Sequence, residues 1–365
     1  MGSHTHFSEK QNRAIDRFCA TYDAVVICDH TSGYYGKYKL LPTLVQLQSD
    51  ITSPFPPLDL MVHIGEISAA SFNDTIPAKE VWRVSEDGEL RDPFKKLTTV
   101  FQMSEEMFFL HYGKDGCNRH VLIDECRELF GEIYEQIPEL PFCNIWTAMQ
   151  LSSRLPKGAL FHMGVSNTRR CWNMFQLPES VESACNVGCC GIDGCVSTLV
   201  GASLVNPDRL CYVVVGDLTF FYDLNSLGNH HIGTNLRVML VNNGRGTEFR
   251  LGIHHCNVFG DDADKYMAAA GHFGNKSPLL VKHYAEDLGF HYLSATTKEE
   301  FMTALSNFTN PQLSDHSMIL EVFTDSKDES EALYLMSHIQ SDAKGMVRSK
   351  LKDAVRNVAG EKGIN

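Results

Sequence analysis

The chain has 365 residues, which at about 150 residues per domain predicts two or three domains and excludes a peptide or a lone small module. Hydrophobic residues make up 43% and charged residues 21%, a composition typical of a folded globular protein rather than a disordered one. The formal net charge of −13 argues against a nucleic acid or an anionic membrane as partner, so any phosphate ligand must be held locally.

The first part of the chain, residues 1–143, has the pattern of a small parallel sheet with helices. Strands are predicted over residues 23–30, 59–65 and 80–84. Residues 92–143 are charged and are predicted to be mostly helical. Continuous apolar strands separated by helical segments are typical of parallel sheets covered on both faces, so we predict an α/β domain that ends near Cys143.

The second part, residues 144–365, alternates strands and helices more regularly. Strands are predicted over residues 159–163, 210–215, 236–241 and 318–322. Helices are predicted over residues 145–155, 220–229, 278–288 and 298–305, and from residues 168, 191 and 330. Because this alternation is typical of doubly wound folds, the sequence predicts two doubly wound parallel-sheet domains of the α/β class.

The cysteines point to a reducing compartment. Twelve of them are spread without a disulfide framework, so we expect free thiols in a cytoplasmic protein. The cluster Cys185, Cys189, Cys190 and Cys195 has a spacing that fits no common zinc site, and buried thiols are the favoured interpretation. No stretch approaches the roughly 18 apolar residues of a membrane-spanning helix, so we expect no membrane span.

Oxygen-bearing side chains follow two of the predicted strands. Gly216 and Asp217 end one strand, and Asn242 and Asn243 follow the next. The residues between them suffice for a crossover helix, so both strand ends should meet at one edge of the sheet. Carboxylate and carbonyl oxygens suit Mg²⁺ or Ca²⁺, and Mg²⁺ would complete its shell with phosphate oxygens. Such residues are also common in ordinary turns, so the spacing leaves a turn and a metal–diphosphate site as alternatives.

This pair of strand ends resembles the diphosphate-binding motif of thiamine-diphosphate enzymes. The longer run over residues 216–227, GDLTFFYDLNSL, is most similar to the menaquinone-pathway synthases that make 2-succinyl-5-enolpyruvyl-6-hydroxy-3-cyclohexene-1-carboxylate. In that family Leu stands where most relatives have a second Gly, as Leu218 does here.

Further segments carry the same resemblance. Residues 188–194 resemble the family's Gly-x-x-Gly-Ile-Asp-Gly segment, and residues 164–170 resemble a loop in which an arginine follows a serine by four positions. Weaker similarity at residues 25–33 and 59–65 matches the family's central domain. The resemblance therefore covers nearly the whole chain and implies a Rossmann-like central domain followed by a thiamine-diphosphate-binding domain.

The resemblance implies roles for residues of the second domain. Those expected to bind the cofactor are Gly191, Ile192, Gly216, Asp217, Leu218, Thr219, Asn243 and Phe249. Asp217, Asn243 and the backbone carbonyl of Arg245 would ligate Mg²⁺. Ser166 and Arg170 would face the carboxylate of a 2-oxoacid substrate, a role that suits a guanidinium group.

Two positions depart from the family's pattern. Val187 stands where the family has its second substrate-binding arginine, and a valine cannot pair with a carboxylate. Glu248 stands where the family has an apolar residue beside the thiazolium ring. The family's reaction joins a succinyl semialdehyde carbanion equivalent, derived from 2-oxoglutarate, to isochorismate. The departures make a paralogous 2-oxoacid decarboxylase or carboligase an alternative to that synthase.

The resembling family also has an amino-terminal pyrimidine-binding domain without a counterpart here. That domain carries the glutamate that activates the cofactor, so we expect no catalytic residue in this chain and no turnover from it alone. The domain would precede residues 2–4, which resemble a loop whose preceding strand is missing, or lie on another chain of a split enzyme. A non-catalytic diphosphate-binding or assembly module is a further alternative. The resemblance implies a homodimer or homotetramer.

Overall fold

The computed structural model describes residues 1–51, 55–66, 76–188, 190–251, 254–267 and 274–341. The chain divides into two compact units. Unit 1 comprises Met1–Pro138 together with the segment from Met336 onward, and unit 2 comprises Glu139–Leu335. The division thus falls shortly before Cys143, and the last segment of the predicted second domain is grouped with unit 1.

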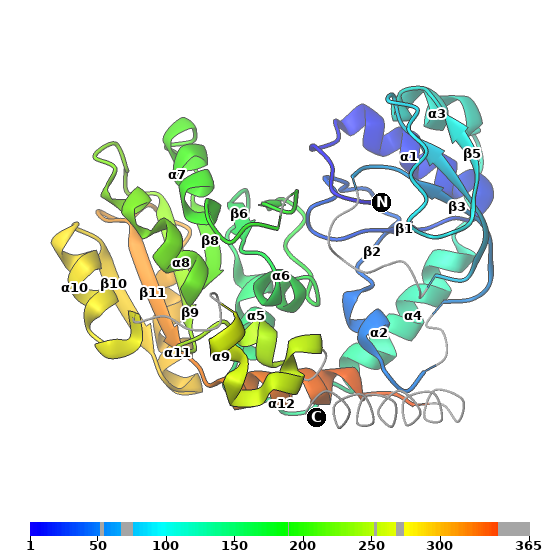
Figure 1. Cartoon of the computed structure of the whole chain (residues 1–365). Coiled ribbons are helices and arrows are strands. Elements are labelled where there is room, and N and C mark those ends of the chain that lie inside the picture. The colour runs from blue at the N-terminus through cyan, green and yellow to red at the C-terminus, as the bar shows by residue number, and fades with distance from the viewer. Residues whose placement is uncertain (52–54, 67–75, 189, 252–253, 268–273, 342–365) are drawn as a thin grey trace. The chain divides into compact units, whose positions relative to one another are not determined.

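Unit 2 is built on one sheet of six parallel strands (Figure 1). Their spatial order is β10 (His291–Ala295), β11 (Met318–Phe323), β9 (Leu236–Asn242), β8 (Cys211–Gly216), β6 (Leu160–Met163) and β7 (Glu182–Cys185). Every residue of β9 is buried, and so are all but the last residues of β8 and β11. Because both faces of these strands are covered, they read in the sequence as continuous apolar runs.

Helices cover both faces of this sheet. The helices of unit 2 are α5 (Asn144–Leu151), α6 (Asn167–Trp172), α7 (Cys195–Val205), α8 (Asp217–Asp223), α9 (Ala263–Tyr266), α10 (Leu280–Asp287), α11 (Lys298–Phe308) and α12 (Ser326–Ser337). On one face, Val196 of α7 and Phe220 of α8 share a core cluster with β8 and β9. On the other face, the Tyr212 hydroxyl donates to the Phe308 carbonyl at the end of α11, at 3.0 Å. The predicted α/β class with parallel, doubly wound sheets is confirmed.

Several predicted elements of unit 2 differ in extent. Strands β7 and β10 were not predicted, because they lie at the two ends of the sheet and are largely exposed, so they lack an apolar run. The helix predicted from residue 191 begins at Cys195, after Gly194 caps it with a positive φ of 85°. The helix predicted over residues 220–229 begins earlier, at Asp217, and continues beyond Asp223 as a 3₁₀ segment.

Unit 1 contains two smaller parallel sheets among its described residues. One pairs β1 (Val26–Ile27) with β2 (Lys39–Leu40), and the other has the order β3 (Leu58–His63), β4 (Ala78–Val84), β5 (Leu97–Phe101). The helices are α1 (Glu9–Tyr22), α2 (Thr43–Leu47), α3 (Glu105–Tyr112) and α4 (Val121–Glu135). The ring of Phe18 on α1 packs against those of Phe108 and Phe109 on α3.

The sequence was less informative for unit 1. The strand predicted over residues 23–30 is only β1, and the segment 92–143, predicted to be mostly helical, contains β5. Helix α1 was missed although its start carries a capping box, in which the Ser8 hydroxyl accepts from the Gln11 backbone and the Gln11 side chain accepts from the Ser8 backbone.

Two further predictions concern the whole chain. The eleven cysteines in the described ranges are free thiols, as predicted. The prediction that the cluster at residues 185–195 is buried is correct only for Cys195, because Cys185 is half-buried and Cys190 is exposed, and Cys189 lies outside the described ranges. Within the same ranges, no helix combines the length and the apolar composition needed to cross a membrane.

Candidate functional site

The candidate site residues gather at the carboxyl edge of the unit 2 sheet. Strands β6, β8 and β9 are parallel neighbours, and Gly216 at the end of β8 pairs with Val241 of β9. The segments that begin at Gly164, Asp217 and Asn243 therefore leave the sheet side by side. This edge is where ligands bind in open parallel sheets.

Asp217 occupies the junction between β8 and α8. Its side chain is buried, with 3% of the residue exposed, and its Oδ1 accepts from the Leu218 backbone N–H at 2.7 Å. Thr219, on the same turn, is also buried. A Cβ added to Gly216 would meet no atom within 4 Å, so the end of β8 borders open space in which a ligand could approach the backbone.

The end of β9 is held in place by a buried carboxylate. The Asn242 side-chain amide donates to Glu321 Oε1 at 2.7 Å, and the Tyr292 hydroxyl donates to Glu321 Oε2 at 2.7 Å. Burial raises the pKa of Glu321, although both hydrogen bonds oppose that shift. Glu321 lies on the neighbouring strand β11 and was not singled out from the sequence, because its position gives no local sign of this role.

Asn243 and the turn that follows it supply further oxygen atoms. The Asn243 side chain is half-buried, and its Oδ1 accepts from the Arg245 backbone N–H at 3.4 Å. Gly244 adopts a positive φ of 81°, which the turn requires. The Arg245 backbone carbonyl already accepts from the Thr247 N–H at 2.9 Å, so only its second lone pair is left for a metal ion.

This donor set fits Mg²⁺ shared with a phosphate ligand better than a cage made by the protein alone. Asp217 offers one carboxylate, and Asn243 and Arg245 offer carbonyl oxygens. Among the residues that the structure describes, no group of three or more His, Cys, Asp or Glu side chains forms a metal cluster. Mg²⁺ typically takes one or two carboxylates and completes its octahedron with phosphate oxygens and water, so these residues fit a metal–diphosphate site.

Ser166 has a strained backbone at the end of β6. It precedes α6 with φ 57° and ψ −121°, a conformation that residues other than glycine rarely adopt. Such strain costs about 1–3 kcal/mol and is concentrated at functional loops. The residue is exposed, and its carbonyl accepts from the Arg170 backbone N–H at 3.1 Å, which ties the loop to the first turn of α6.

Arg170 and Glu248 form a bidentate ion pair. The distances are 2.6 Å between Nη2 and Oε1 and 3.1 Å between Nη1 and Oε2, and the side chains are 23% and 20% exposed. Burial acts to lower the pKa of Arg170, but the hydrogen bond and the charge of Glu248 outweigh it and raise that pKa. The charge at Glu248 is thus neutralised within the chain, by the guanidinium group expected to face a substrate.

The chain was also compared with known proteins. No protein-family model matches it. It is 33% identical over 263 residues to the 2-succinyl-5-enolpyruvyl-6-hydroxy-3-cyclohexene-1-carboxylate synthase of Bacteroides fragilis, a match that covers 70% of this chain and 45% of that protein. Proteins of the same name from Phocaeicola vulgatus and Bacteroides thetaiotaomicron are each 32% identical, over 265 and 259 residues, with 70% of this chain and 44% of each relative covered.

The chain is thus similar to these synthases over 70% of its own length. The resemblance inferred from the motifs is therefore confirmed, and the chain spans less than half the length of the curated relatives that it matches.

The remaining candidate residues lie on other loops of unit 2. Gly191 and Ile192 are half-buried in the loop between β7 and α7, and Val187 lies in the same loop. Phe249 is half-buried in a 3₁₀ segment after β9, and its ring packs edge-on against His254 at 5.2 Å between centroids. These loops follow the carboxyl ends of β7 and β9, so they belong to the same edge of the sheet as Asp217.

Glu329 is a buried acid that the sequence did not point to. It is 2% exposed in the first turn of α12, and its Oε1 accepts from the Asn144 N–H and the Thr324 hydroxyl, both at 2.9 Å. Burial raises its pKa to about 7, against opposing hydrogen bonds that include one with Asn167. Asn167 in turn accepts from Arg170 Nη1 at 3.3 Å. A titratable carboxyl is therefore connected to the Ser166–Arg170 loop.

Proposed function

We propose that this chain is the part of a thiamine-diphosphate- and Mg²⁺-dependent 2-oxoacid carboligase that holds the diphosphate end of the cofactor. The observation that carries the proposal is the position of Asp217 and Asn243 at adjacent strand ends, beside the open space at Gly216. Asp217, Asn243 and the Arg245 carbonyl would hold Mg²⁺, and Thr219 would contact the diphosphate. When bound, the cofactor supplies the nucleophilic carbon needed to decarboxylate a 2-oxoacid and transfer the remaining fragment.

The apolar side chains at this edge would accommodate the rest of the cofactor. Ile192 and Phe249 are only half-buried in the chain, so each has surface left to pack against a ring. Gly191 would let the backbone approach the ligand, and the Leu218 backbone continues the diphosphate-binding turn. Together these residues would keep water from the reacting end of the cofactor.

The substrate is proposed on the basis of Ser166 and Arg170. The synthase reaction, which joins a fragment of 2-oxoglutarate to isochorismate, is the first candidate because of the family. A second candidate, a paralogous 2-oxoacid decarboxylase or carboligase, is favoured by the ion pair between Arg170 and Glu248. The Arg170 guanidinium group is already paired with Glu248, and Val187 offers no positive charge. A substrate without a second carboxylate would therefore suit this site better.

Titration calorimetry tests the cofactor proposal. We expect Mg²⁺ and thiamine diphosphate to bind the wild-type chain together, and Asp217→Asn to weaken this binding about tenfold or more, because the variant loses the only proposed carboxylate ligand. Asp208→Asn is the matched control, since Asp208 is exposed in a turn of the same unit. Equal affinities for wild type and Asp217→Asn would remove Asp217 from the metal site.

We further propose that the purified chain binds the cofactor without turnover. The glutamate that activates the cofactor would come from a pyrimidine-binding domain, either elsewhere in the same protein or on another chain. Decarboxylation of 2-oxoglutarate by the purified chain would contradict this proposal. We also propose a homodimer or homotetramer, which analytical ultracentrifugation of the purified chain would test.

A further inference from the structure

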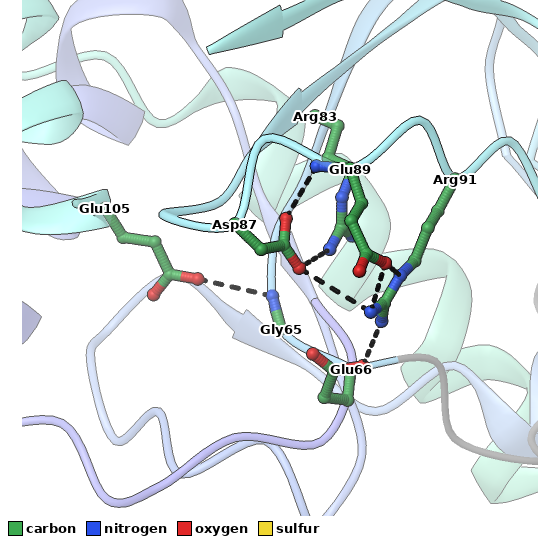
Figure 2. Close-up of polar contacts among 7 residues, drawn as sticks. All are labelled: Gly65, Glu66, Arg83, Asp87, Glu89, Arg91 and Glu105. Atoms are coloured by element: carbon green, nitrogen blue, oxygen red, sulfur yellow. Dashed lines mark hydrogen bonds and ion pairs between the residues drawn. The ribbon is translucent and has the colours of Figure 1, made fainter. Parts of the chain in front are cut away.

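The Glu329 carboxylate, in the first turn of α12, is buried without a cation beside it. The residue is 2% exposed, and no ion pair joins it to a Lys, Arg or His side chain of the described ranges. Carboxylates of unit 1 show the more usual arrangement, because Glu66 and Asp87 lie 2.5 and 3.6 Å from the guanidinium group of Arg91 (Figure 2). Since a buried carboxylate without a cation depends on hydrogen bonds to keep its charge, the donors around Glu329 determine what it can do.

Three uncharged groups of unit 2 donate to Glu329. Its Oε1 accepts from the Asn144 N–H and the Thr324 hydroxyl, both at 2.9 Å, and these two bonds use both lone pairs of that atom. The third donor is the side chain of Asn167, in the first turn of α6. Oε2 of Glu329 is therefore the atom left for the Asn167 amide.

Asn167 connects this acid to Arg170. A side-chain amide has an oxygen that accepts and an NH₂ group that donates, so its two ends serve different partners. Asn167 donates to Glu329, and its Oδ1 accepts from Arg170 Nη1 at 3.3 Å and from the Cys171 thiol at 3.6 Å. An ionised Glu329 can only accept, so it keeps the Asn167 oxygen on the side of Arg170.

Protonation of Glu329 would reverse this arrangement. Oε1 already accepts from two donors, so the proton is held by Oε2, which then donates toward Asn167. The Asn167 amide must turn its oxygen to Glu329 and its NH₂ group to Arg170. A guanidinium group has no acceptor, so Arg170 loses this partner.

The surroundings of Glu329 bring its titration close to neutral pH. Burial raises the pKa of Glu329 to about 7, and the charge of Asp328 adds to this shift, while the three hydrogen bonds oppose it. The other titratable groups that act on it are the thiols of Cys143 at the start of α5 and Cys171 on α6. Burial raises the pKa of both thiols, so they stay neutral, and the guanidinium group beyond Asn167 stays charged.

We propose that Glu329 is a positioning residue for the Arg170 guanidinium group: its ionised form fixes the Asn167 amide with the oxygen on Arg170, and its protonated form withdraws that oxygen. This inference rests on the proposed function, in which Arg170 binds a substrate carboxylate. The bond from Asn167 would hold Arg170 in place when a substrate carboxylate replaces Glu248 as its partner. Binding of a 2-oxoacid is then tight above the pKa of Glu329 and weak below it.

NMR of the full chain tests the connection without a substrate. The side-chain amide resonances of Asn167, assigned by their loss in Asn167→Leu, should shift with a midpoint near pH 7. Glu329→Gln should abolish this transition, whereas Glu331→Gln, at an exposed position of α12, should leave it unchanged. Resonances of Asn167 that stay constant from about pH 5.5 to 8.5, or a transition that persists in Glu329→Gln, would overturn the proposal.

Calorimetry with 2-oxoglutarate, on the chain supplied with Mg²⁺ and thiamine diphosphate, measures the effect on Arg170. We expect the wild-type affinity to fall about tenfold from pH 8 to pH 6, the size of effect expected when a charged group loses a hydrogen bond. Glu329→Gln places an NH₂ group where the proton would be, and Asn167→Leu removes the acceptor. Both variants should therefore bind weakly at both pH values, and Glu331→Gln should follow the wild type.

The outcomes separate this inference from the proposed function. Equal wild-type affinities at the two pH values, or weaker binding by Glu329→Gln and Asn167→Leu that keeps the tenfold pH step, would overturn the positioning role. If 2-oxoglutarate binds at neither pH while the Asn167 resonances titrate as expected, the substrate role of Arg170 fails and the connection between Glu329 and Arg170 is supported.

Discussion

The two units of the molecule share parallel sheets but differ in continuity. In unit 2, six strands form one sheet, and its inner strands β8, β9 and β11 are buried on both faces. In unit 1, the described strands form separate sheets of two and three strands, and β3 has buried and exposed positions mixed along its length. A parallel sheet depends on its inner strands for stability, so unit 2 offers the firmer support for a binding site.

A leucine-to-alanine substitution should lower the free energy of unfolding more in the sheet of unit 2 than in the sheets of unit 1. Leu240→Ala removes a fully buried side chain from β9 and should lower the free energy of unfolding by about 2–5 kcal/mol. Leu60→Ala on β3 should cost less than half as much, because Leu60 is only half-buried. Urea unfolding followed by circular dichroism measures both. Equal costs would contradict the difference between the sheets.

A buried acid should make the stability of unit 2 depend on pH. The pKa of Glu329 rises from 4.5 in the unfolded chain to about 7 in the folded one because of burial. The folded state thus binds more protons between these values, and its stability falls as the pH rises through this window, by about 3 kcal/mol at most. Below pH 4.5 the contribution is fully present.

Glu329→Gln removes this titration. Its side-chain oxygen can still accept from Asn144 and Thr324, which both donate to Oε1. We expect the variant to be more stable than wild type at pH 8 and nearly flat between pH 5 and 8. Glu331→Gln, at an exposed position of the same helix, is the control. Unfolding curves that show the same pH dependence for wild type and Glu329→Gln would refute the assignment.

The pair Arg170–Glu248 should be coupled more strongly than an exposed pair in the same unit. A double-mutant cycle with Arg170→Met and Glu248→Gln should give about 1–2 kcal/mol of coupling, because the pair is bidentate and mostly buried. The pair of Arg209 and Glu182 is more exposed and should give less. Calorimetry should also show tighter binding of 2-oxoglutarate by Glu248→Gln. Equal coupling energies from the Arg170–Glu248 cycle and an Arg209–Glu182 cycle would contradict this prediction.

The smallest effect is expected at the surface of unit 1. The hydrogen bond and charge of Lys79 lower the pKa of Asp59, and both side chains are exposed. Lys79→Met should return the pKa of Asp59 toward its ordinary value in an NMR titration while leaving the Tm unchanged. A clear loss of Tm would mean that the edge of this sheet depends on surface charge.

How far the sequence could predict the molecule depended on burial. Strands β8 and β9 were predicted because both faces of each are covered, and Asp217 and Asn243 followed from their ends. Strands β7 and β10 were missed because end strands are partly exposed and carry no apolar run. Helix α1 was missed although its capping box is a local signal that could have been used.

The site shows the same limit. Arg170 and Glu248 were each singled out, but their pairing joins positions 78 residues apart and leaves no trace in either local sequence. Glu321 and Glu329 gave no signal at all, because their roles come from partners on separate segments.

The sequence by itself determined the α/β class, the inner strands of unit 2, the residues at their ends and the resemblance to the synthase family. These features depend on hydrophobic patterning and on motifs within short stretches, which local sequence records. Only the tertiary structure decided that Glu248 neutralises Arg170 and that Glu329 is buried. Each of these depends on which distant segments meet, and that is set by packing of the whole chain.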